Sequence, residues 1–384
     1  MKKILFLLVL FILMPRNVYA DATKLLDEYA DLYGEVFEKG ISGAENSFME
    51  IMPDFNPKQL LRDINSGNIS ISLKDILKYL LKLLLDEIYA GIKLMAIVLT
   101  MSVLSSYLSE LKSSFGGESV ATVAFYTCYI IIAGVAATAF YEAASCVSET
   151  VSSIAFFMRV LVPVMVTTLM TSGAIISATV FEPTLIAIVE IGVWVIDGLF
   201  LPLVMISTAL NIVNGMSQKF KTDKMVLLIN NGVKWGLSVM LTIFVSITGL
   251  KSIASSGADA LTIKLSKFAA SNLIPMVGGI LAESVETVMG CSVVIKNSVG
   301  ILGIICLIVI VLMPIIKISS ILILFRITAA IIEPISDIKI SDCMTRLAGS
   351  VSSLFSMLTA TTVMFIIIIT IMINAGSSAV MAGG

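Results

Sequence analysis

The chain has 384 residues, of which 58% are hydrophobic and only 14% charged, and its mean hydropathy is +1.02. Soluble domains contain about 45–50% apolar residues, so this composition excludes an ordinary soluble protein and indicates an integral membrane protein. The net charge of −2 gives no basis for nucleic-acid binding, and the absence of histidine removes the commonest acid–base group and metal ligand.

The N-terminal part of the chain is predicted to lie outside the cytoplasm. Residues 1–20 have the pattern of a signal peptide, with Lys2 and Lys3 before a short apolar core and a small-residue cleavage pattern ending at Ala20. An uncleaved anchor is the alternative. Residues 21–87 then form an acidic helical region with 13 acidic and 7 basic residues. Its last helix is predicted to start near Ser72, and the region is either a cap on the membrane part or a docking surface for a partner.

The rest of the chain is predicted to be all-α and polytopic, with about 8–10 helical membrane segments. Residues 88–150 would hold two leading transmembrane helices, 151–250 a first membrane repeat, and 251–267 a linker with an interfacial helix. Residues 268–375 would form a second membrane repeat, and 376–384 a short tail. The expected apolar segments cover about 88–108, 120–141, 154–171, 174–198, 199–214, 226–248, 273–290, 292–315, 317–333 and 347–373.

A tandem repeat is suggested by two pairs of prolines. Pro163 and Pro275 lie 112 residues apart, and so do Pro202 and Pro314. Each copy is followed by a polar turn and a further apolar run, TDKMVLL in the first and SDCMTRL in the second. Four segments in each copy would make the two repeats parallel, as in duplicated transport folds. Chance similarity between apolar sequences is the alternative. With the N-terminus outside, loops 215–225 and 334–346 fall inside, whereas the lysines of 249–267 fall outside, against the positive-inside rule.

Charged residues within apolar segments are the candidate functional residues. Ionisable groups at membrane depth cost at least about 2.5–3.5 kcal/mol each, so they should face protein or water. Two interpretations stay open: a polar path or cation site between helices, or structural ion pairs. The counter-charges considered are Arg159, Arg326, Lys296 and Lys317, and the candidate polar path comprises Glu182, Glu190, Asp197, Arg159, Glu283, Glu286 and Lys296.

No catalytic motif is found. The sequence has no P-loop and no nucleophile elbow, and zinc sites or triads that need histidine are impossible, so we expect no enzyme, cofactor or metal. The five cysteines form no C-x-x-C pair and are expected to be buried apolar residues. Prolines are expected to break or kink helices at Pro163, Pro183, Pro202, Pro275 and Pro314.

An extended similarity identifies a family. The stretches KFAASNLIPMVGGILAESVETVMGCSVVIKNSVGI (267–301) and RITAAIIEPISDIKISDC (326–343) resemble the stage III sporulation protein AE family of endospore-forming bacteria, and LVPVMVTTLMTSGAIISATVFEPTL is similar to the same family. This resemblance implies a subunit of the channel-like complex between mother cell and forespore. It also implies the mother-cell (outer forespore) membrane, an N-terminal region between the two membranes, and forespore protein Q and the other stage III sporulation A proteins as partners.

Three functions are therefore carried forward. The favoured one is the membrane-embedded component of a sporulation channel or secretion-like assembly. The alternative is a stand-alone secondary transporter that uses Glu182, Glu190 and Asp197. The third is a structural scaffold, for which those carboxylates would be dispensable.

Overall fold

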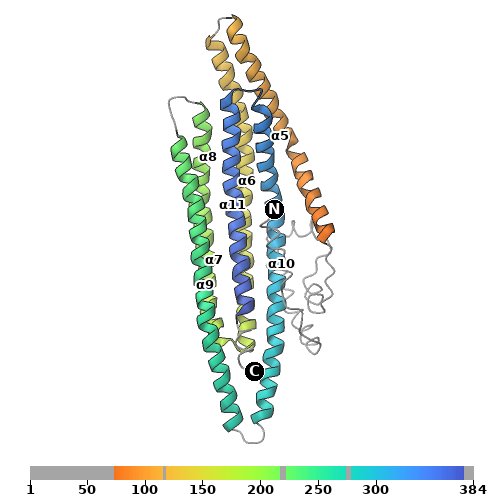
Figure 1. Cartoon of the computed structure of the whole chain (residues 1–384), viewed down its shortest axis with the longest axis vertical. Helices are drawn as coiled ribbons and strands as arrows, with labels where there is room; N and C mark the ends of the chain where they lie inside the picture. Colours follow the sequence, from red (N-terminus) through yellow and green to blue (C-terminus); the bar gives the residue numbers. More distant parts are fainter. Residues whose placement is uncertain (1–72, 116–117, 217–221, 274–277, 376–384) are drawn as a thin grey trace.

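A computed structural model describes residues 73–115, 118–216, 222–273 and 278–375, and these residues form helices joined by short turns (Figure 1). The expected signal peptide, residues 21–72, Pro275 and the tail 376–384 lie outside the described residues. In chain order the elements are α5 (Leu73–Phe115), α6 (Glu118–Thr171), α7 (Ile175–Val195), the π-helix η2 (Ile196–Phe200), α8 (Leu201–Met216), α9 (Asp223–Leu273), α10 (Gly278–Ile332) and α11 (Ile338–Asn374).

The helices run alternately up and down one long bundle (Figure 1). Six of them in the described part of the chain are long and apolar enough to cross a membrane, and α7, η2 and α8 together make one of the six. The all-α membrane class predicted from composition is therefore confirmed. The number of segments differs from the expected eight to ten, because neighbouring apolar runs are joined within single helices.

Two of the helices that combine such runs contain prolines that were expected to interrupt helices. The runs 120–141 and 154–171 are both part of α6, which contains Pro163. The runs 292–315 and 317–333, with the described part of 273–290, fall in α10, which contains Pro314. A proline removes one intrahelical hydrogen bond, but neighbouring helices and hydroxyl side chains can satisfy the freed groups inside a membrane protein.

A third pair of runs is joined by the π-helix η2, which keeps α7 and α8 in one continuous span. Pro202 follows it directly and would place its ring against the carbonyl of Gly198 in a regular α-helix. The wider π-turn moves that carbonyl away, so the chain absorbs the proline without a break. The predicted runs 174–198 and 199–214 are consequently one span, Ile175–Met216.

Residues 251–267, expected to form a linker with an interfacial helix, instead continue α9 without interruption. The expected boundary between residues 150 and 151 likewise falls inside α6. The C-terminal end of α8, the N-terminal end of α9 and the turn at 333–337 lie at the same end of the bundle (Figure 1). Pro202 and Pro314 both lie in upward helices that lead to this end, while the tandem repeat itself stays a prediction.

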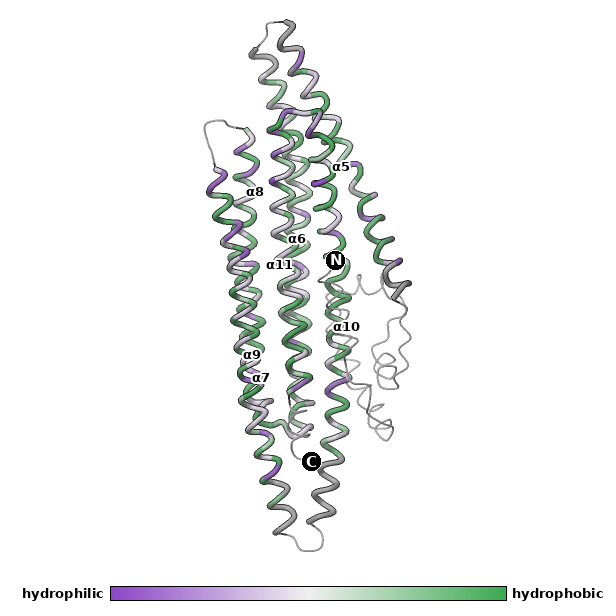
Figure 2. The backbone as a smooth tube through the Cα atoms, in the orientation of Figure 1, coloured by the Kyte–Doolittle hydropathy of each residue, from purple (hydrophilic) through white to green (hydrophobic). Residues whose placement is uncertain are grey.

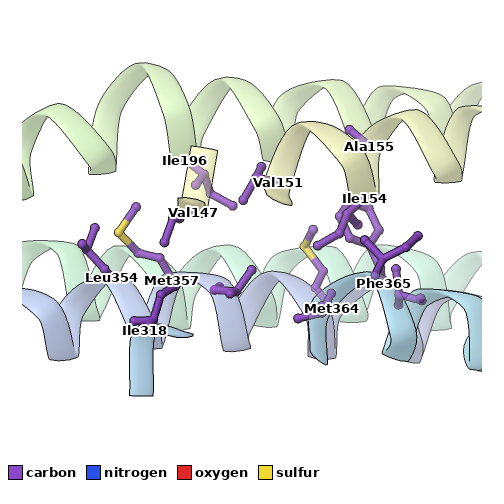
Figure 3. Close-up of a cluster of buried hydrophobic side chains, with 14 of the residues drawn as sticks. Val147, Val151, Ile154, Ala155, Ile196, Ile318, Leu354, Met357, Met364 and Phe365 are labelled. Atoms are coloured by element: carbon purple, nitrogen blue, oxygen red, sulfur yellow. The ribbon is translucent and has the colours of Figure 1, made fainter. Parts of the chain in front are cut away.

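The centre of the bundle is a packed apolar core. α6 packs against α5, α7, α10 and α11, and α11 packs against α6, α8, α9 and α10. Both lie between α7, α8 and α9 on one side and α5 and α10 on the other, so we call these two helices innermost (Figure 1). Figure 3 shows side chains from four elements meeting along their shared axis. Those labelled are Val147, Val151, Ile154 and Ala155 of α6, Ile196 of η2, Ile318 of α10, and Leu354, Met357, Met364 and Phe365 of α11, all of them buried.

The outer surface is also apolar, as expected where lipid takes the place of water. Hydrophobic residues occur along most of the length of the helices (Figure 2), and many large ones are exposed. Trp194 is 68% exposed and Trp235 is 72% exposed. The 55 residues of α10 span about 80 Å at ~1.5 Å per residue, whereas the hydrocarbon layer is only about 30 Å thick.

Candidate functional site

One ion pair joins two residues of the predicted polar path. Arg159 of α6 donates to both carboxylate oxygens of Glu190 in α7, with Nε–Oε1 at 2.6 Å and Nη2–Oε2 at 3.0 Å. The two side chains are 48% and 52% exposed, so the pair lies on the outer surface of the bundle. Its two-pronged geometry neutralises both charges at a surface where single charges are costly.

Asp197 occupies the π-helix, apart from that pair. Its side chain is half-buried beside Ser148 of α6, and its Oδ1 atom is buried with no partner among the described residues. π-turns are frequent at functional sites because they redirect side chains and free backbone carbonyls. Asp197 is therefore the member of the predicted path whose surroundings most resemble a binding site.

Lys296 is fully buried within α10. Its ammonium group donates to the carbonyl of Ala375 at the C-terminal end of α11. The last carbonyls of a helix lack intrahelical partners and carry partial negative charge, so a cation is stabilised there. Lys296 thus fastens the end of α11 to α10, and its place on a polar path stays a prediction.

The remaining predicted residues are spread over the bundle. Glu182 is partly buried in α7, and Arg326 is exposed on α10 while Lys317 of the same helix is partly buried. Glu283 and Glu286 lie in the first part of α10, and their side chains are outside the described residues. The structure thus brings together Arg159 and Glu190, and the continuous polar path stays a prediction.

The sequence analysis missed a buried carboxylate at the N-terminus of α7. Asp259 of α9 is 1% exposed and accepts hydrogen bonds from the backbone N–H groups of Ile176 at 2.8 Å and Ser177 at 3.1 Å. α7 has no cap from its own chain neighbour, because Ala174 carries no polar side chain. Asp259 therefore caps α7 from another helix and complements the positive end of its dipole.

A second missed cluster ties helices together at the other end of the bundle. Asp223 accepts a hydrogen bond from Asn214 at 2.6 Å and pairs with Arg346 of α11. The buried Tyr129 of α6 donates to the carbonyl of Ile212 at 2.8 Å. Asp223 and Arg346 are in the two polar turns that mark the predicted repeat, which is the one sequence signal that pointed to this cluster.

The described residues hold no constellation of three or more His, Cys, Asp or Glu suited to a metal ion. Cys128, Cys146, Cys291, Cys306 and Cys343 are free thiols, and three of them are buried. The polar contacts found here are helix caps, an ion pair and a clamp between helices. Such contacts position helices and hold a bundle together.

Comparisons with known proteins agree on one family. A family model described as stage III sporulation protein AE (spore_III_AE) matches residues 55–376. The Stage III sporulation protein AE of Bacillus subtilis (strain 168) is 28% identical over 331 residues, which cover 86% of this chain and 83% of that protein. No solved structure matches the chain.

Proposed function

Because the chain belongs to the stage III sporulation protein AE family, we propose that it is the membrane-embedded subunit of a sporulation complex that joins mother cell and forespore. Its proposed partners are the other stage III sporulation A proteins and forespore protein Q. The proposed location is the mother-cell (outer forespore) membrane, with the N-terminal region in the space between the two membranes.

The packed apolar centre of the bundle is the observation that carries this proposal. Val151, Ile154, Met357 and Phe365 fill the axis between the two innermost helices (Figure 3). The charged pair Arg159–Glu190 instead lies on the outer surface. A solute that passes through the complex would therefore move between subunits rather than through the middle of this chain, which favours an assembly subunit over a stand-alone transporter.

The distribution of basic residues supports the proposed orientation. Lys224 near the α8–α9 turn, and Lys339 and Arg346 near the α10–α11 turn, lie at one end of the bundle. Positively charged residues flank membrane spans mainly on the cytoplasmic side. We therefore assign this end to the mother-cell cytoplasm, which puts the N-terminal region on the other side.

Crosslinking in sporulating cells tests the proposal. A photo-crosslinking amino acid at the exposed Trp194 or Tyr89 should capture other stage III sporulation A proteins, and deletion of the chain should stop forespore development. The same amino acid at the buried Phe365 is the matched control and should capture none of them. Ion-coupled solute uptake by the purified chain alone in lipid vesicles would contradict the proposal.

A second candidate function, secondary transport through Glu182, Glu190 and Asp197, is favoured by the unpartnered buried oxygen of Asp197 at the π-turn. It predicts that Glu190→Gln with Asp197→Asn abolishes both uptake in vesicles and sporulation. Normal sporulation by this double variant would remove the charged path from consideration and leave the assembly function intact.

A further inference from the structure

The outer face of α9 is apolar over more than the thickness of a bilayer. Leu227 is 59%, Trp235 72%, Ile253 77% and Phe268 67% exposed. Residues 227 to 268 span about 60 Å at ~1.5 Å per residue, about twice the ~30 Å of hydrocarbon. Lipid tails therefore cover only part of this face, and protein must cover the rest if large apolar patches are to stay out of water.

Unpaired charges of opposite sign lie on two different outer faces. Lys234 is exposed on α9, whereas Glu142 and Glu149 are exposed on α6, and none of the three belongs to an ion pair within the described residues. Glu149 accepts one hydrogen bond, from the Ser145 hydroxyl at 2.9 Å, which leaves its negative charge without a counter-charge. Each of these groups next to lipid costs at least about 2.5–3.5 kcal/mol. A contact that pairs a lysine with a glutamate would relieve both costs at once.

Lys234 and Glu149 lie at nearly the same height in the bundle. Gly236, in the same turn as Lys234, packs so closely on Phe200 that a Cβ atom would lie 2.7 Å from its ring. One turn before Phe200, Asp197 lies beside Ser148, the neighbour of Glu149. α7 packs against both α6 and α9, so the two outer faces lie on either side of it.

Both faces also permit close approach of another helix. Gly232 of α9 and Gly134 of α6 are exposed, and a Cβ atom added at either would meet nothing within 4 Å. Small residues on membrane-facing surfaces let helix backbones pack closely, because lipid offers no competing hydrophobic gain.

From these observations we propose that copies of this chain associate head to tail in the membrane, with the outer face of α9 of one copy packed on the outer face of α6 of the next. Lys234 of one copy pairs with Glu149 or Glu142 of its neighbour at the centre of this contact. The proposal goes beyond the sporulation function, since it concerns self-assembly and needs no other protein.

The charges also select this arrangement over a two-fold dimer through α9. Among the side chains of α9 that the structure describes, the exposed charged ones outside any ion pair are Lys224, Lys234 and Lys264. Asp223 is bound to Arg346, Asp259 is buried, and Lys251 is partly buried and donates to Thr184. A two-fold contact centred on α9 would bring like charges together, which is unfavourable in a medium of low dielectric constant. A heterologous contact repeats from copy to copy and gives a ring or an open array.

Cysteine crosslinking between two differently tagged chains in the same membrane tests the proposal. One chain carries Lys234→Cys and the other carries Glu149→Cys or Glu142→Cys, and the thiols are bridged with short bifunctional reagents. We expect mixed dimers from these pairs, and ladders of higher oligomers when both substitutions are in one chain. The control Asp86→Cys, exposed on α5, should give no mixed dimer with Lys234→Cys.

Charge exchange provides the second measurement. Lys234→Glu should weaken association, measured by chromatography in mild detergent, at least about tenfold, because like charges then face each other. Adding Glu149→Lys and Glu142→Lys to the same chain should restore association, and Lys234→Arg should leave it unchanged.

Three results would each overturn the proposal. They are dimers that form only between two Lys234→Cys chains, association that is unaffected by Lys234→Glu, and a monomer in vesicles of native lipid. If a different protein binds this face in place of a second copy, the chain should be a monomer in vesicles. None of these three results would contradict the proposed sporulation function.

Discussion

At the scale of single residues, the structure depends on side chains that satisfy helix ends. Asp259 supplies the cap that α7 lacks, and it is nearly inaccessible to solvent. Asp259→Ala should lower the free energy of unfolding in detergent by about 1–2 kcal/mol, the usual cost of a lost N-terminal cap. Thermal unfolding measures this. The matched control Lys264→Ala, at an exposed position of the same helix, should change stability by much less; equal effects would contradict the capping function.

Lys296 makes the corresponding contact at a helix C-terminus. Lys296→Glu would place a buried negative charge beside the partly negative carbonyls of α11, and we expect it to cost about 3–5 kcal/mol or to prevent folding. Lys296→Met keeps the length of the side chain and removes only the charge, so it should be tolerated better. Membrane yield and melting temperature compare the two variants. Unchanged yield and melting temperature in both variants would show that the end of α11 needs no cation.

The surface pair Arg159–Glu190 permits a test by exchange. Arg159→Glu or Glu190→Arg alone brings like charges together at the lipid-facing surface, so each should lower the yield of folded protein. Both substitutions in one chain restore an opposite pair and should recover much of that yield. Fluorescence-detected chromatography of a tagged chain reports the yield. No recovery in the double variant would show that the residues act separately.

Part of this residue-scale account could be predicted from the sequence. Arg159 and Glu190 were candidate partners because unpaired charges in apolar segments need counter-charges. Asp259 could not be recognised, because it lies in a stretch interpreted as a linker and its partners are backbone groups 82 and 83 residues away in the chain. A contact of that kind leaves no local pattern, unlike a capping residue next to its own helix.

At the scale of the elements, the sequence predicted helices but divided them too finely. Prolines and short polar stretches were interpreted as ends, whereas Pro163 and Pro314 lie within helices and Pro202 follows a π-turn. Inside a tightly packed bundle, neighbouring helices stabilise a continuous segment that would break in isolation. The interior of α9 shows the same effect, because Ser252–Gly257 remains helical there.

The turn between α6 and α7 shows how a helix ends in this protein. Gly173 adopts φ +85, and the N–H groups of Gly173 and Ala174 bond the carbonyls of Met170 and Leu169, the hydrogen-bond pattern of a Schellman motif. Gly173→Ala should destabilise the protein by about 1 kcal/mol or more, because the left-handed conformation disfavours a Cβ and Met289 would have to move. Thermal unfolding tests this, with Gly232→Ala, at an open helical position, as the control that should not destabilise. Equal stability of the two variants would contradict the account of the turn.

At the scale of the whole molecule, six apolar spans among the described residues alternate in direction, four of them around the central α6 and α11, and leave a long apolar exterior. The membrane class followed directly from the composition. The lengths of the helices and the position of α6 and α11 at the centre could not be predicted, because every segment is apolar on most sides and hydrophobic periodicity then carries little information about which face is buried.

The most direct test of this account is the sidedness of the turns. Single cysteines at Lys224 and Lys339, which lie near two turns at one end of the bundle, are treated with a membrane-impermeant thiol reagent, and a cysteine at Lys264, near the other end, is treated in parallel. The account predicts that only the cysteine at Lys264 reacts in intact cells, and that those at Lys224 and Lys339 react after the membrane is opened. Labelling of all three positions from the same side would contradict the alternating membrane bundle.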